Sequence, residues 1–171
     1  MDPKPSTARA IELEIDCDRY PEIDRALAYW REKKGDRELP SRADIDPLEI
    51  SKSLPRVMVA EVSYDPLEFR YRLAGTGLFA MHGQELTGQL ARDLNPPEFG
   101  ALIHSHYSEV VARRVPILHV IELTSDDVMT SYARIILPLS GDGKVIDRLL
   151  TVEAHEDHAI NLRRFFEETK E

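Results

Sequence analysis

Cysteine is almost missing from this chain, which has 171 residues and a single cysteine, Cys17. A lone cysteine excludes an internal disulfide and any zinc or iron–sulfur site built from several cysteines. The chain is long enough to bury a sizeable hydrophobic core in one domain, so it needs neither kind of cross-link for stability. We expect no metal site.

Positive charge is also in deficit, with 22 Lys and Arg against 31 Asp and Glu and a net charge of −9. A surface that binds nucleic acid normally needs an excess of positive charge, so we do not expect nucleic acid as a partner.

The longest apolar runs, such as Val57–Ala60, are as long as a strand and far short of the roughly 20 residues that span a bilayer. The N-terminus has no basic start followed by an apolar run, so no signal peptide is visible. We expect a cytoplasmic protein without a membrane partner.

Motifs for covalent or nucleotide chemistry are scarce as well. The G-x-S-x-G motif of serine hydrolases is absent, and we expect no catalytic residue. The segment Gly75–Ala80 fits a loose dinucleotide fingerprint, but the strand before it alternates like a one-sided antiparallel strand. Gly75 then serves a tight turn from strand to helix. A small pocket enzyme stays open as an alternative, with polar candidates at Tyr71, Tyr132, His82, His106 and His119.

Hydrophobic periodicity gives the order of the elements. The pattern predicts a short strand or extended arm at 11–18, a helix at 18–34, a short helix from Asp46 to about Ser53, strands at 57–62 and 69–73, short helical turns after Thr76, a longer helix from Pro97 to about Arg114, strands at 117–123, 131–139 and 145–154, and a helix at 155–171. Five antiparallel strands with helices on one face make a two-layer α+β domain, with flanking helices at both ends. We divide the chain into an arm (1–18), a helical cap (19–54), a core (55–154) and a C-terminal helix (155–171).

The helices between the second and third core strands leave a hollow against the sheet, and such hollows commonly bind small ligands. Residues on the predicted inward faces of these strands and helices are expected to surround it: Tyr71, Leu73, Phe79, Phe99, Ile103, His106, His119 and Tyr132. A register error of one residue would turn a whole set of strand side chains to the opposite face.

Both terminal helices are amphipathic. The first carries Ile23, Leu27 and Trp30 on one stripe, and the last carries Phe165 and Phe166. Short helices are marginal in water, so something must cover each stripe. Either the helices fold back on their own domain or they pack across a two-fold axis. We favour a homodimer with Ile23, Leu27 and Trp30 in the interface.

Three segments carry a family resemblance. Leu39–Pro47, Leu54–Met58 and Phe69–Thr76 resemble a bacterial family of stand-alone PAS-domain proteins, long known only as a domain of unknown function. Shorter matches continue through Leu137–Ser140, so the resemblance covers roughly residues 20–153. It implies a PAS fold and a sensory or regulatory role, and it carries no catalytic residue set. It does not identify a ligand, because PAS folds host many.

The cofactor stays unknown at this point. Some PAS domains hold haem through a histidine on the helix where His106 lies, but a hydrogen-bonded core histidine is far commoner. Light-sensing PAS domains use a cysteine inside the core, and Cys17 precedes it. Photochemistry of that type is therefore not expected.

From this resemblance we expect a sensory or regulatory PAS module that binds a small ligand, a protein, or both. We expect no attached effector domain, so its output passes through a protein partner in trans. A pocket enzyme, or a purely structural adaptor with a filled core, stays open as an alternative.

Overall fold

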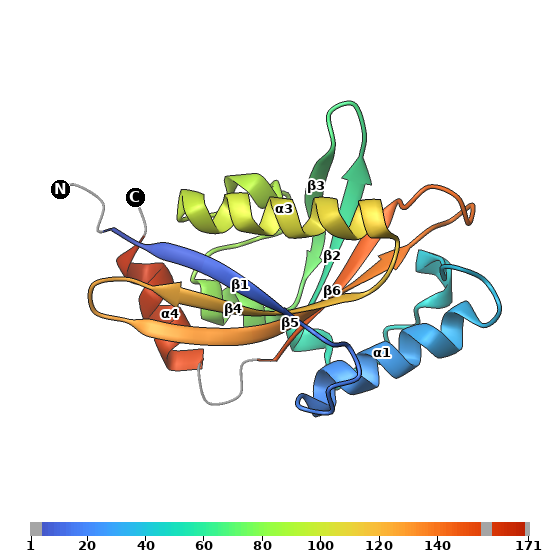
Figure 1. Ribbon diagram of the computed structural model, residues 1–171, viewed down its shortest axis with the longest axis horizontal. Coiled ribbons are helices and arrows are strands. Elements are labelled where there is room, and N and C mark those ends of the chain that lie inside the picture. Colours follow the sequence, from blue (N-terminus) through green and yellow to red (C-terminus); the bar gives the residue numbers. More distant parts are fainter. Residues whose placement is uncertain (1–4, 155–158, 170–171) are drawn as a thin grey trace.

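A six-stranded antiparallel sheet forms the centre of the computed structural model, which describes residues 5–154 and 159–169. The strands follow the order β1-β4-β5-β6-β2-β3 across the sheet (Figure 1). Their bounds are β1 Thr7–Leu13, β2 Val57–Ser63, β3 Glu68–Ala74, β4 Ile117–Thr124, β5 Met129–Leu139 and β6 Arg148–Ala154. This confirms the predicted α+β class with an antiparallel sheet.

Four α-helices and three short 3-10 helices complete the described fold. They are α1 Pro21–Lys34, η1 Arg42–Asp44, η2 Leu54–Arg56, α2 Thr76–His82, η3 Ala91–Asp93, α3 Pro97–Arg113 and α4 Ala159–Glu168. The C-terminal helix was predicted from residue 155, but residues 155–158 and 170–171 lie outside the described part. None of the described helices is both long and apolar enough to cross a membrane.

Two local predictions need correction. The sheet has six strands and not five, because the N-terminal segment pairs with β4 from Thr7 to Leu13, earlier in the chain than predicted. The expected helix from Asp46 to Ser53 does not form. Its backbone instead makes separate turns, such as the bond from Glu49 N to Asp46 O, and the Asp46 carboxylate accepts a bond from Leu48 N. Local bonds of this kind compete with a helix.

Helices cover both faces of the sheet. On one face, α3 and α4 pack against β5, and α2 packs against α4. On the other face, α1 packs against β5 and β6. The alternation along β6 separates the two faces, since Glu153 lines a cavity with α3 whereas Val152 lines a groove with α1. We call these the inner face and the outer face of the sheet.

The stripe of α1 lies within the core of the protein itself. Ile23, Leu27 and Trp30 are buried, and Trp30 is only 4% exposed. Trp30 Nε1 also donates a 2.9 Å hydrogen bond to the carbonyl of Pro138 in β5. The prediction that these three residues form a dimer interface is therefore wrong, because the outer face of the sheet already covers them.

The apolar stripe of α4 is covered in the same way. Phe165 and Phe166 are buried, and the ring of Phe166 lies 5.1 Å from that of Phe99 and 4.5 Å from that of His82. Both terminal helices thus fold back on their own domain, which was the other of the two alternatives. Gly75 joins β3 to α2 where a side chain would collide with the Leu54 carbonyl, as the tight turn requires.

Candidate functional site

The predicted hollow lies between the inner face of the sheet and the helices α2 and α3. Its lining residues are Met58, Tyr71, His82, Leu86, Leu94, Phe99, Ile103, Tyr107, Tyr132, Arg134 and Glu153. The free volume is about 10 Å³, which is about the space needed for one water molecule. The hollow is therefore almost filled by side chains, and several of these are polar.

Most of the predicted ligand-binding residues do lie together. Tyr71, Phe99, Ile103 and Tyr132 line the hollow. His106 and His119 are also buried, and they contact the wall residue Arg134. Phe79 belongs to α2, but its side chain lies outside the described part of the structure.

Leu73 is the exception, and its predicted place in the hollow is wrong. It pairs with Val59, whereas Tyr71 pairs with Ala60, so Arg72 has no partner of its own. Such a bulge reverses the alternation of side chains along a strand. Leu73 consequently lies on the face opposite to Tyr71 and is 44% exposed.

Arg134 is the central residue of the site, and the sequence analysis missed it. Its side chain is 1% exposed, and its Nη2 donates to His106 Nδ1 at 2.7 Å and to His119 Nδ1 at 3.1 Å. Its Nε and Nη1 have no hydrogen-bond partner among the described residues. The signal was available, because Arg134 follows Tyr132 at the strand period of two in an otherwise apolar run.

The two histidines are neutral, and their tautomers are fixed. Arginine is a donor only, so Nδ1 of both His106 and His119 must accept, and each ring carries its proton on Nε2. The rings stack with their centroids 3.9 Å apart. Burial, and then the positive charge of Arg134, lowers the pKa of His106 to about 2 and that of His119 to about 3. His106 is thus a hydrogen-bonded core residue, the commoner of the two interpretations.

Tyrosines form a second part of the site. The hydroxyls of Tyr71 and Tyr107 are 3.0 Å apart and hydrogen-bonded. Burial raises the pKa of Tyr71 and of Tyr132 well above the usual value, so both phenols are protonated at neutral pH. The guanidinium carbon of Arg134 lies 5.8 Å from the centroid of the Tyr107 ring, within the range of a cation–π contact.

A carboxylate faces Arg134 across the sheet. Glu153 on β6 is the direct cross-strand partner of Arg134 on β5, and both line the hollow. Opposite charges in this position lower the cost of burying each other. Glu153 Oε1 is also 3.8 Å from His82 Nε2, and neither ring nitrogen of His82 has a hydrogen-bond partner among the described residues.

This set of side chains is suited to binding. It holds the fixed donors of Arg134, the neutral imidazoles of His106 and His119 beside it, and protonated phenols. The described residues also contain no cluster of three or more histidine, cysteine or acidic side chains that could hold a metal ion.

One comparison with known proteins assigns a family to the chain. No curated protein matches the chain. Among solved structures, it resembles an RNA-binding Light-Oxygen-Voltage receptor with a TM-score of 0.44 and 14% identity, over 98% of this chain and 42% of that one. The chain thus spans less than half of that receptor. A family model described as a PAS domain matches residues 19–152. Because this match covers most of its length, the chain belongs to the PAS domain family.

Proposed function

We propose that the protein is a cytoplasmic PAS sensory module that binds a small polar molecule in the hollow and acts on a protein partner. PAS domains are generally sensory and non-enzymatic modules, which supports the general role. The observation that carries the finer proposal is Arg134, a permanently charged and buried side chain, two of whose nitrogens have no acceptor among the residues that the structure describes. A buried polar group without a partner is costly, so an acceptor brought by a ligand stabilises it.

The chemistry of Arg134 defines the kind of ligand. A guanidinium pairs best with a flat group that offers two oxygen acceptors, such as a carboxylate. The free volume of about 10 Å³ admits only a water-sized group without movement of the walls. Any larger ligand therefore has to displace part of the lining.

We expect the α4 helix, which packs behind the wall of the hollow, to move. Its ring Phe166 lies against Phe99 and His82, two residues of the lining. A ligand that enters beside His82 competes with Phe166 for this space. Displacement of α4 would then expose Phe165 and Phe166 to a partner protein, which gives binding an output.

The test is an NMR titration of the isotope-labelled protein with formate, acetate and succinate. We expect saturable shifts of the Arg134 Nε signal and of amides in α4 with at least one of these acids. An Arg134→Met variant, verified to be folded by circular dichroism, should lose them. Arg70→Met, which removes an exposed arginine from β3, is the matched control and should behave like the unchanged protein.

A structural adaptor is the second candidate, and the near absence of free space in the hollow favours it. An adaptor with a filled core predicts that none of these acids shifts the Arg134 signal. It also predicts a large interface buried against a partner.

A further inference from the structure

A second cavity lies on the outer face of the sheet, away from the hollow. It is a groove of about 500 Å³ between α1 and the segment 49–53. Sites for small molecules typically have volumes of about 300–1,000 Å³. The groove is thus large enough for a ligand without any rearrangement.

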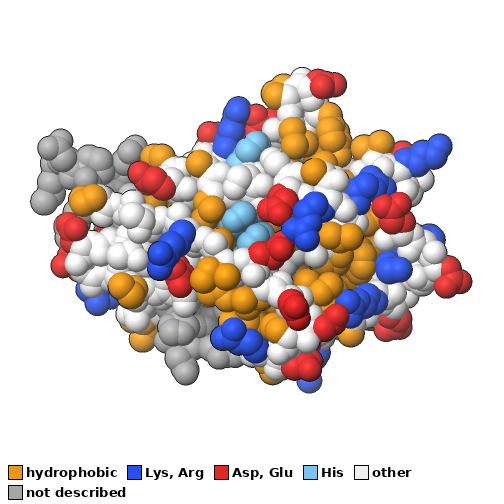
Figure 2. Space-filling view, viewed as in Figure 1, with side chains coloured by type: hydrophobic (Ala, Val, Ile, Leu, Met, Phe, Trp, Pro, Cys, Tyr) orange, Lys and Arg blue, Asp and Glu red, His pale blue; other side chains and the backbone are white. Residues whose placement is uncertain are grey.

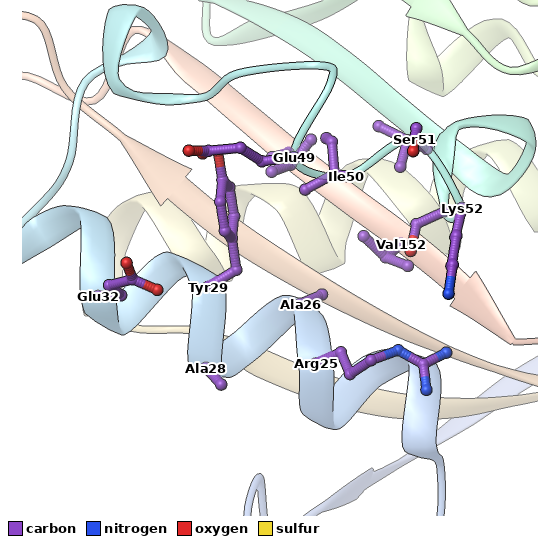
Figure 3. Close-up of a pocket in the computed structure, with 13 residues that line it drawn as sticks. Arg25, Ala26, Ala28, Tyr29, Glu32, Glu49, Ile50, Ser51, Lys52 and Val152 are labelled. Carbon is purple, nitrogen blue, oxygen red and sulfur yellow. The ribbon is translucent and has the colours of Figure 1, made fainter.

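The groove has an apolar floor and walls. Buried residues of β2 and β6 form the floor, namely Val57, Leu150 and Val152. Ala26 on α1 and Ile50 on the opposite segment are half-buried and face each other across it (Figure 3). An apolar ligand body would find contact on three sides.

Charge is distributed unequally along the groove. Two cations, Arg25 from α1 and Lys52 from the opposite wall, point toward the same end in Figure 3. Neither has an ion-pair partner in the part of the chain that the structure describes. Glu49, the nearest acidic wall residue in sequence to Lys52, instead accepts a bond from Tyr29 at 2.6 Å and pairs with Lys33 at 2.9 Å.

The side chains of Arg25 and Lys52 repel each other because no carboxylate of the described residues pairs with either, and an anion bound between them would offset this repulsion. We propose that this groove binds an amphipathic organic anion, with its carboxylate or phosphate head between Arg25 and Lys52 and its apolar body on Val57, Leu150 and Val152. Charge complementarity at one end and apolar contact along the floor fit this class of ligand together. The inference does not depend on ligand binding in the hollow.

The experiment uses the fluorescent probe 1-anilinonaphthalene-8-sulfonate, which has an apolar body and one negative charge. The unchanged full-length protein should bind it saturably at one site, and both decanoate and decyl phosphate should displace it. Decyltrimethylammonium, which has a similar tail and the opposite charge, should not. Arg25→Gln/Lys52→Gln should weaken probe binding at least tenfold, and these exposed positions leave the fold intact.

Two further variants make the result specific. Arg70→Gln/Lys144→Gln changes the net charge by the same amount elsewhere on the surface and should bind the probe normally. Ala26→Trp fills the groove and should abolish binding, with Ile50→Trp as the alternative if Ala26→Trp does not fold. Absence of saturable binding, equal displacement by the cationic amphiphile, or unchanged binding by the Arg25/Lys52 variant would each overturn the proposal.

Discussion

The fold holds His106 and His119 in their neutral form. Their pKa values of about 2 and about 3 lie far below the value of 6.5 for an exposed histidine. Between these limits the unfolded chain binds protons that the folded protein does not. Their contribution to stability is therefore complete above pH 6.5 and is lost as the pH falls.

We expect the free energy of unfolding to fall with acid by about 1.4 kcal/mol per pH unit for each histidine, over roughly pH 5.5 to 4. His106→Asn/His119→Asn keeps an acceptor near each Nδ1 position and removes both titrations, so its stability should depend less on pH. Urea unfolding at a series of pH values measures both slopes. Equal slopes in the two proteins would show that these histidines are not held neutral.

Arg134 shows how far sequence reasoning reaches at the scale of single residues. The period of two placed Tyr71 and Tyr132 correctly, because side chains alternate in a regular strand. The same alternation also places the side chain of Arg134 on the inner face. Charged residues are rarely buried, so residue type alone argues against this position. No sequence signal pairs Arg134 with His106, since that contact depends on how α3 lies across the sheet.

In the β3 strand, the predicted alternation of inward and outward side chains fails at Leu73. The bulge at Arg72 depends on pairing with β2, which a period of two does not reveal. Leu73→Ala should therefore change the free energy of unfolding by no more than about 0.5 kcal/mol, because the side chain is partly exposed. Phe69→Ala, in the same strand but fully buried, should cost about 3–5 kcal/mol. Similar losses in urea unfolding would place Leu73 in the core after all.

The α1 helix was predicted with nearly correct bounds, because Pro21 begins it and Gly35 follows its end. Its covering surface was not predicted, since an apolar stripe looks the same against a sheet or against a second subunit. Trp30→Ala should lower the free energy of unfolding by about 3–5 kcal/mol, since it opens a cavity and leaves the Pro138 carbonyl without its donor.

The Trp30→Ala variant also distinguishes packing of α1 on its own sheet from packing of α1 against a second subunit. Sedimentation velocity of Trp30→Ala, at a temperature where it is folded, should give the same oligomeric state as the unchanged protein. Trp30→Phe, which keeps most of the buried area, should show a smaller loss of stability. A shift from dimer to monomer in Trp30→Ala alone would restore the dimer interface at this stripe.

At the scale of the whole molecule, the family and the order of the elements from β2 to α4 could be predicted from the sequence. Antiparallel pairing and the position of the hollow follow from that order. The surfaces that α1 and α4 cover depend on packing between segments that are distant in the chain. Hydrophobic periodicity does not reveal such long-range packing. Figure 2 shows acidic and basic side chains mixed over one face of the molecule, and the net charge of the chain is −9.

The central claim is that Arg134 in the hollow receives a small ligand. Native mass spectrometry of freshly purified protein, compared with its denatured mass, tests it most directly. The unchanged protein and Arg70→Met should carry a surplus mass that denaturation removes, and folded Arg134→Met should carry none. A native mass equal to the denatured mass in the unchanged protein, or the same surplus in Arg134→Met, would contradict the account.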